Sequence, residues 1–564
     1  MIREKDDMYG FLAMINSYET LSLYSPLQWY LNPDEKNVKK YISHMSFGKL
    51  GIYDYLIYLQ DMPEDSKETK LYKKKVKREY LKYIDQVFKA CLGEKRAKEY
   101  KASDIWDVEY SLLLEMGWNE HMKSDPDYYN KVPTHNLEEK YGFDWNTFAK
   151  KLGFKNIPKE IVITNLNGFK CTTRLLKENW SSKKWKTYLI FIQFKQMIRF
   201  ENSLRHIHFD FHHKFLEGQP VQMPSEIYPL FGLALMFNTF LSEQYVKHNY
   251  NPLYVNYVKK MTDDLKYLFI KKIEVNDWLS PTTKKAALAK LQKLVIYVGA
   301  PENLRYDPIL DYIDDDPLHN TGLLLNWKHK QSIELEGKPI IDIPEFDWHT
   351  FKMVGTQCYM VNAYYRPNSN SIYVPLAYLQ KPFIDLEERG LEYNLVYIGY
   401  TLGHELSHSL DDTGSKYDAD GNLNNWWTDS DRKAFKKKVK NVIDQYELFA
   451  KRDGIKFDAE MSAGESLADI SGMALVEGYL LDNQIVNDEL IKMKKMNLAK
   501  FYMNLAIQGQ QLIYKKAIKA QLLTNPHPLE KYRVNCAMAR LELFKQIYGI
   551  KKTDGMWWES DTIW

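Results

Sequence analysis

Two histidines spaced four residues apart constrain this chain more than any other feature of its sequence. Residues 403–412 read GHELSHSLDD, so His404 and His408 are four apart and Glu405 directly follows the first of them. On an α-helix, residues four apart share one face, and both imidazoles can bind a single zinc ion without straining the backbone. Glu405 lies on the flank of that face, where it could take a proton from a metal-bound water and return it to a leaving amine. The motif alone also fits a surface helix with two solvated histidines.

A second segment supplies what such a metal site would still need. A catalytic zinc takes a third protein ligand, keeps a fourth position for water, and has its histidines oriented by carboxylates. The downstream sequence SAGESLADISGMAL places Glu465 and Asp469 four residues apart, again on one face of a predicted helix. Glu465 is therefore the candidate third ligand. Asp469 could accept a hydrogen bond from one histidine ring, and Asp411, three residues after His408, from the other.

Four motifs, in order along the chain, carry a resemblance to a known family. They read VNAYYRPNSNSIYVPLAYLQKPF (361–383), IGYTLGHELSHSLDDTGSKYDADGNLNNWW (398–427), GESLADISG (464–472) and NPHPLEKYRVN (525–535). Together they resemble the neprilysin and endothelin-converting-enzyme family of zinc metallopeptidases. The first half of the chain is similar more loosely, through FDFHHKFLEGQ and DWLSPTTKKAALAKLQK. The family's tryptophan in the helix before the last motif has no counterpart within AIQGQQLIY (506–514).

The resemblance implies a catalytic centre with one Zn²⁺ per chain. His404, His408 and Glu465 would bind the ion, and Glu405 would be the general base. His527 would stabilise the oxyanion of the tetrahedral intermediate, a contribution that is worth about 10²–10³ in rate when one donor supplies it.

The resemblance also implies orienting and substrate-binding residues. Asp411 and Asp469 would orient the ligand histidines, and Asp469 would thereby take part in catalysis. Two neighbouring residues, Asn362 and the backbone at Ala363, would hold the substrate as an added strand, a mode in which main-chain hydrogen bonds supply affinity. The last two residues, Arg533 and Phe383, have two interpretations each. Arg533 would bind a substrate carbonyl or fix Asp469, and Phe383 would form the wall of an apolar pocket or belong to the core.

The predicted fold is mainly α-helical with a smaller β component. The resemblance implies a thermolysin-like catalytic domain over 326–564 and a large helical lid domain over 1–325, which together enclose an internal cleft. Such a cleft would admit oligopeptides and exclude folded proteins, with cleavage on the N-terminal side of bulky apolar residues. The hydrophobic pattern predicts a helix within 277–299, a hairpin over 355–375 around RPNSNS, and helices near 393–411, 429–450, 463–481 and 490–520.

Composition limits the partners that we expect. The 564 residues include 77 basic and 74 acidic ones, a net charge of +3 that gives no reason to expect nucleic acid as a partner. No apolar run is long enough for a signal peptide or a transmembrane segment, and the four cysteines show no CxxC spacing. We therefore expect a cytoplasmic or otherwise intracellular protein, with leaderless export and the oligomeric state left open.

Two alternatives remain at this point. The segment RHIHFDFHHKF alternates His206, His208, Asp210 and His212 on one face of a possible strand, which could bind a metal, although buried or solvated histidines are the favoured interpretation. The chain as a whole could also be a catalytically inactive relative that acts as a peptide-binding or structural protein.

Overall fold

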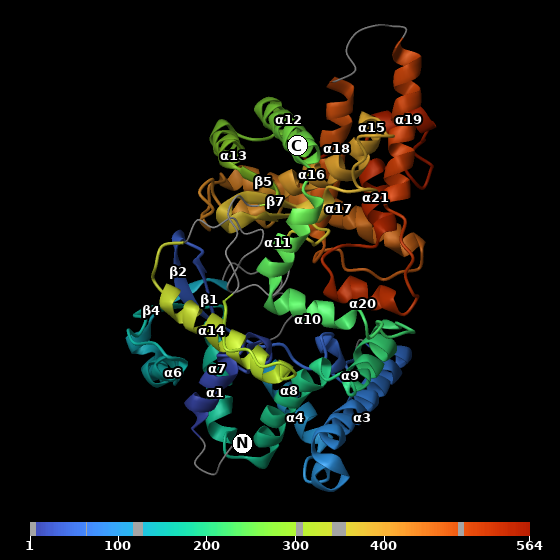
Figure 1. The fold of residues 1–564 in the computed structure, drawn as a ribbon. Coiled ribbons are helices and arrows are strands. Elements are labelled where there is room, and N and C mark those ends of the chain that lie inside the picture. Colours follow the sequence, from blue (N-terminus) through green and yellow to red (C-terminus); the bar gives the residue numbers. More distant parts are fainter. Residues whose placement is uncertain (1–6, 64, 117–127, 301–307, 341–356, 483–489) are drawn as a thin grey trace.

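The structure is a computed structural model that describes residues 7–63, 65–116, 128–300, 308–340, 357–482 and 490–564. Helices dominate it, and two small sheets of four and three strands complete it, which confirms the predicted mainly α class. Two units lie one above the other: the blue to cyan segments belong to the lower, N-terminal unit and the orange to red segments to the upper, C-terminal unit (Figure 1). None of the helices within the described ranges has the length and apolar character needed to cross a membrane.

The N-terminal unit packs helices around a four-stranded sheet with the order β1-β2-β4-β3. Strands β1 and β2 form an antiparallel hairpin, β2 pairs parallel with β4, and β3 pairs antiparallel with β4. The elements are α1 (Met8–Asn16), α2 (Glu19–Ser22), β1 (Gln28–Asp34), β2 (Asn37–Ser46), α3 (Lys67–Ala97), α4 (Ala102–Glu115), β3 (Asn130–Pro133), α5 (Leu137–Tyr141), α6 (Trp145–Leu152), β4 (Glu160–Ile163), α7 (Leu166–Asn179), α8 (Lys183–Phe200), α9 (Arg205–Phe209) and the π-helix η5 (Asp210–Glu217).

The C-terminal unit packs helices against a three-stranded sheet with the order β5-β7-β6. Strand β7 pairs parallel with β5 and antiparallel with β6, which leaves β6 at an edge. The elements are α12 (Pro252–Val275), α13 (Pro281–Lys293), β5 (Val295–Gly299), β6 (Tyr364–Arg366), β7 (Ser371–Pro375), α15 (Leu391–Asn394), the π-helix η8 (Leu395–Gly399), α16 (Tyr400–Ser407), the 3₁₀ turn η9 (His408–Leu410), α17 (Asp429–Arg452), α18 (Ala463–Asp482), α19 (Leu490–Gln508), α20 (Ala517–Thr524), α21 (Glu530–Met538) and α22 (Glu542–Tyr548).

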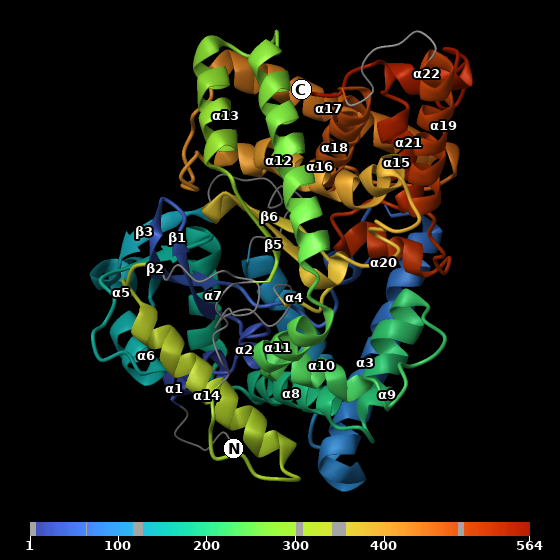
Figure 2. The ribbon, with the colours of Figure 1, turned by 45° about the horizontal axis from the view of Figure 1, so that its top comes forward.

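The chain passes between the two units more than once. Helices α10 (Tyr228–Met236) and α11 (Asn238–Asn249) lead upward from the N-terminal unit to α12 (Figure 2). Buried residues of α12, α13 and β5 then belong to the same hydrophobic core as the residues beyond 357. Helix α14 (Pro317–Leu335) returns to the N-terminal unit, whose core it covers. The packing places 252–299 with the second unit and α14 with the first. The boundary near residue 325 stays a prediction.

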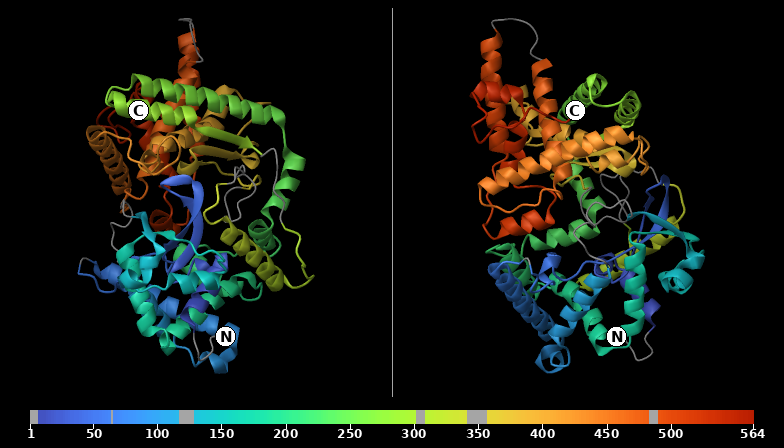
Figure 3. Two further views of the ribbon diagram at one scale, coloured as in Figure 1. Left: turned by 90° about the vertical axis from the view of Figure 1, so that its left-hand side faces the viewer. Right: turned by 180° about the vertical axis from the view of Figure 1, so that it is seen from behind.

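The two units touch at a second place, away from the connecting helices. The backbone N–H of Leu423 donates to the carbonyl of Glu35 at 2.6 Å, and the N–H of Val38 donates to Asn422 Oδ1 at 3.1 Å. The β1–β2 hairpin thus reaches from the lower unit to the upper one, as the left view of Figure 3 shows. The two units are therefore in direct contact at this hairpin as well.

Several local predictions are confirmed. Helix α13 begins where Ser280 caps the N–H of Thr283 and Pro281 occupies the first turn, although the helix ends at Lys293 and the segment continues as strand β5. The turn over 367–370 joins β6 and β7 as the predicted hairpin, whose first two residues lie outside the described ranges. The last predicted helix is interrupted: α19 ends at Gln508 and α20 starts at Ala517.

Candidate metal centre

Helices α16 and α18 cross at a pair of glycines, and this crossing brings the two predicted motifs together. A Cβ atom on Gly403 would lie 2.8 Å from the carbonyl oxygen of Gly472, and one on Gly472 would lie 2.6 Å from the backbone nitrogen of His404. Since side-chain carbons do not approach other atoms so closely, only glycine permits this helix spacing. His404 directly follows Gly403, and Asp469 precedes Gly472 by three residues, so both motifs face the same space.

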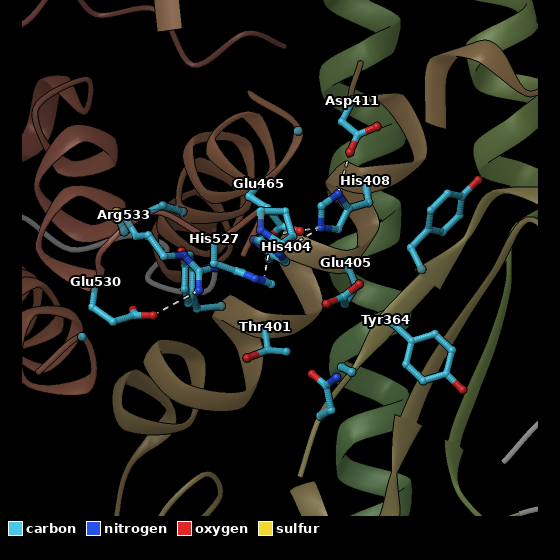
Figure 4. A pocket seen from close by; sticks show the side chains of 18 of the residues that line it. Tyr364, Thr401, His404, Glu405, His408, Asp411, Glu465, His527, Glu530 and Arg533 are labelled. Carbon is cyan, nitrogen blue, oxygen red and sulfur yellow. Dashed lines mark hydrogen bonds and ion pairs between the residues drawn. The ribbon is translucent and has the colours of Figure 1, made fainter. Parts of the chain in front are cut away.

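Four side chains with metal-binding atoms converge beside the crossing (Figure 4). The Nε2 atoms of His404 and His408 lie 3.0 Å apart. Glu465 Oε2 lies 3.2 Å from Nε2 of His404 and 3.6 Å from Nε2 of His408. Nε2 of His527 lies 3.1 Å from the same oxygen. Ligands that surround zinc tetrahedrally at about 2 Å are roughly 3.3 Å from one another. Two imidazole nitrogens and one carboxylate oxygen at these separations therefore fit a zinc ion.

Two buried carboxylates orient the histidine rings from behind. Nδ1 of His404 lies 2.9 Å from Asp469 Oδ1, and Nδ1 of His408 lies 2.6 Å from Asp411 Oδ2. Asp411 is itself fixed, because its Oδ1 accepts two backbone N–H groups of the turn that follows. Metal binding would need each Nε2 to be unprotonated, and a carboxylate beside each Nδ1 favours the tautomer that has its proton on Nδ1.

Asp469 is the most heavily bonded residue of this group. Arg533 donates to it from Nε and Nη2, both at 2.8 Å, and the hydroxyl of Tyr400 donates at 2.7 Å. Burial alone would raise the pKa of Asp469, but the Arg533 guanidinium and the hydrogen bond from His404 hold it far below its usual range. Of the two interpretations of Arg533, this geometry matches the one in which it fixes Asp469. Tyr400 was not predicted, although its position one helical turn before His404 is a signal that the sequence offers.

Opposite charges also keep Glu465 ionised. Burial would raise the pKa of its carboxyl, but hydrogen bonds from His404, His408 and His527 hold that pKa far below its ordinary value. Burial would likewise lower the pKa of His408, yet Asp411 and Glu465 hold it well above the usual range. Glu465 thus interacts with three histidines, and His408 with two carboxylates.

Glu405 is not part of the hydrogen bonds described so far. Its side chain is buried, and its Oε2 has no hydrogen-bond partner among the residues that the structure describes. Burial raises the pKa of the carboxyl, although His408 and His404 act in the opposite direction. A buried carboxyl with a raised pKa and a free oxygen beside a metal-binding cluster has the properties of a proton acceptor.

A pocket of about 790 Å³ opens over the cluster. All the predicted site residues except Asp469 line it, and Asp469 lies behind it. Asn362 is exposed and Ala363 buried, and both directly precede the edge strand β6. Phe383 is half-buried in the wall, with its ring centroid 4.6 Å from that of Tyr378. His527 comes from the loop before α21, where its Nδ1 lies 2.8 Å from Asn525 Oδ1.

The histidine-rich segment of the N-terminal unit does not form the strand that was considered above. It forms helix α9 and the π-helix η5, so the predicted strand is wrong. The rings of His208 and His212 stack 4.3 Å apart, and burial lowers the pKa of His208 to about 2. Within the described ranges, groups of three metal-binding side chains occur only at the pocket above α16. The favoured interpretation, partly buried or solvated histidines, matches this geometry, because His212 is buried, His208 is half-buried and His206 is exposed.

Comparisons with known proteins identify relatives of the whole chain. Two sequence models of peptidase family M13 match the chain, one over residues 2–301 and one over 362–562. A neutral endopeptidase of Lactobacillus helveticus is 30% identical over 62% of this chain and 51% of its own length. The neutral endopeptidase of Lactococcus lactis is 25% identical over 94% of this chain and 80% of its own length.

A solved structure shares the fold. The zinc metalloprotease Zmp1 of Mycobacterium tuberculosis, determined in complex with an inhibitor, superimposes with a TM-score of 0.83 at 24% identity, over 99% of this chain and 82% of that one. Together the two family models cover most of the 564 residues. The chain therefore belongs to peptidase family M13, the neprilysin-like family of zinc metalloendopeptidases.

Proposed function

We propose that this protein is an active endopeptidase that hydrolyses oligopeptides at the pocket above α16, with one zinc ion per chain. The observation that carries the proposal is the convergence of His404, His408 and Glu465 at distances that suit a single ion. The ion, when bound, would polarise both the attacking water and the substrate carbonyl. Asp469 and Asp411 would hold the imidazoles in place for it.

The protein's own side chains would carry the proton transfers. Glu405, with its unpartnered oxygen, would take the proton of the attacking water and deliver it to the leaving nitrogen. His527 would donate a hydrogen bond to the oxygen on which negative charge develops. Its position beside Glu465, with its side chain 40% exposed at the pocket wall, supports that role.

The substrate would lie along β6. That strand is an edge of the three-stranded sheet, and the exposed Asn362 precedes it at the pocket. An extended peptide could add a strand there through main-chain hydrogen bonds, with Asn362 and Ala363 at its centre. Phe383 and other apolar residues of the pocket would favour a bulky apolar side chain after the scissile bond. The direct contact of the β1–β2 hairpin with the upper unit, which would limit the width of an opening, supports a preference for oligopeptides over folded proteins.

A catalytically inactive peptide-binding protein is the competing function. The two can be separated with a mixed oligopeptide pool read by mass spectrometry, using wild-type protein, Glu405→Gln, and protein that is chelated and then given zinc back. We expect cleavage by the wild type, loss in the variant and after chelation, and recovery with zinc. Stoichiometric zinc without any cleavage would favour the inactive alternative.

A further inference from the structure

The wall of the pocket becomes apolar on the side of α18, α19 and α21. There its wall is formed by the buried residues Met473, Leu505 and Val534, which we call the apolar recess. Met473 lies one helical turn after Asp469 on α18, and Val534 directly follows Arg533 on α21. The recess therefore begins where the pair of Asp469 and Arg533 ends, next to the metal-binding cluster.

One polar side chain interrupts this apolar surface. Gln508 is the last residue of α19, follows Leu505 by three positions and lines the same pocket. Its Oε1 is buried and has no hydrogen-bond partner among the described residues. An amide oxygen that has lost water without gaining a protein donor is unfavourable, and natural interiors contain few such atoms. A bound ligand with a donor at the right place would remove this penalty.

Gly509, the residue after Gln508, packs closely on α21. A Cβ atom on Gly509 would lie 2.3 Å from Cγ2 of Val534, so the end of α19 rests directly on α21. The end of α19 is therefore packed against α21 beside the recess. This packing places the Gln508 side chain in the wall of the pocket.

We propose that Gln508 determines side-chain specificity: the recess takes the residue after the scissile bond and prefers aromatic side chains that carry a hydrogen-bond donor, tyrosine and tryptophan, over phenylalanine and leucine. This inference rests on the proposed function. The apolar part of the ring would pack on Met473, Leu505 and Val534. Its O–H or N–H would donate to the Gln508 carbonyl. Sites that hydrogen-bond a substrate group discriminate strongly against analogues that lack it, because the protein atom is then left unpaired.

The test compares peptides that differ only at this position, with tyrosine, tryptophan, phenylalanine or leucine. We would measure kcat/KM for the wild type, Gln508→Leu and Gln508→Glu. The wild type should prefer tyrosine to phenylalanine by about 5–10-fold, as one neutral hydrogen bond to a buried acceptor supplies. Gln508→Leu should reduce that ratio to about one while it keeps the phenylalanine peptide as a substrate. Gln508→Glu retains an acceptor and should retain the preference. Gln546→Leu, the same change at an exposed position outside the pocket, is the control.

A binding measurement separates this inference from the proposed catalysis. The same peptides would be titrated calorimetrically into Glu405→Gln protein with and without Gln508→Leu. A preference for tyrosine that depends on Gln508 supports the inference even if no peptide is cleaved. Equal affinities and rates for tyrosine and phenylalanine, or a preference that survives Gln508→Leu, would overturn it.

Discussion

The backbone of Gly472 lies so close to that of His404 that a Cβ atom on the glycine would be 2.6 Å from the histidine nitrogen. This contact sets the distance between α16 and α18, and with it the separation of His404 from Glu465. A metal centre built from two helices depends on that distance as much as on the ligands, because zinc tolerates only small changes in ligand position.

Gly472→Ala should therefore weaken both the fold and the metal centre. The added methyl has only backbone atoms to displace, so we expect a loss of about 1–3 kcal/mol in the free energy of unfolding and a loss of bound zinc. Denaturant unfolding and metal analysis measure the two effects. Gly478→Ala is the matched control on the same helix, because a Cβ atom there would have no atom of the other described elements within 4 Å. Equal zinc content in the two variants would contradict the prediction.

Asp469→Asn should lower zinc affinity without abolishing the site. Asp469 accepts hydrogen bonds from Tyr400 and Arg533 while it faces His404. Loss of such an orienting carboxylate reduces metal affinity by about 10–100-fold. Competition with a chelator of known affinity measures it. Tyr400→Phe removes only one of the donors to Asp469 and should have a smaller effect. An unchanged zinc affinity in Asp469→Asn would show that the carboxylate does not orient His404.

Acid should destabilise the N-terminal unit through buried neutral histidines. Burial lowers the pKa of His44 to about 4, and its ring is almost completely inaccessible. Because the unfolded chain takes up this proton near pH 6.5 and the folded one only near pH 4, stability is complete above pH 6.5 and falls as the pH drops toward 4, by about 3 kcal/mol. His208, with its pKa lowered to about 2, acts in the same direction.

Urea unfolding at pH 7.5 and pH 5 measures this effect. In His44→Gln the difference between the two pH values should shrink, since the group that titrates is gone. His206→Gln, at an exposed position of the same unit, should leave the difference unchanged. A pH dependence that is identical in all three proteins would exclude His44 as a source.

A fragment limited to 326–564 should not fold by itself. The core that supports the metal centre includes Val258, Leu265 and Phe269 of α12 and Leu291 of α13, which such a fragment lacks. Removal of these side chains exposes a large apolar area, and each is worth about 1.5–3 kcal/mol of burial. We expect insoluble or unfolded protein by circular dichroism, and recovery when residues 252–300 are supplied as a second chain. A soluble, cooperative fragment would instead support a domain boundary near 325.

The sequence could predict which side chains meet at the pocket above α16 because the information for it is local. The spacings within HELSH and ESLAD place side chains on one helical face whatever the rest of the fold is, and Asp411 follows from the same short-range geometry. Helix α13 and the β6–β7 hairpin were predictable for a similar reason, from a capping serine and a turn-rich segment.

What the sequence did not predict depends on contacts between distant segments. Tyr400 gains its role only because α18 brings Asp469 within reach of its hydroxyl. The alternation of histidines around His208 matched a strand, but packing of the segment on α3 and α8 favoured a helix with a π-helical turn. Hydrophobic periodicity does not indicate that α12 packs in the second unit and α14 in the first, because an amphipathic helix has the same pattern in either unit.

The order of the site residues along the chain also has a consequence for biosynthesis. A ribosome delivers the HELSH helix first, the Glu465 helix about sixty residues later, and His527 and Arg533 about sixty after that. Until α18 docks at Gly403 and α21 follows, the nascent chain has a lone pair of histidines and no hydrolytic centre. Synthesis itself therefore delays completion of the proposed ligand set until Glu465 has been made, and of the proposed oxyanion donor until His527 has been made.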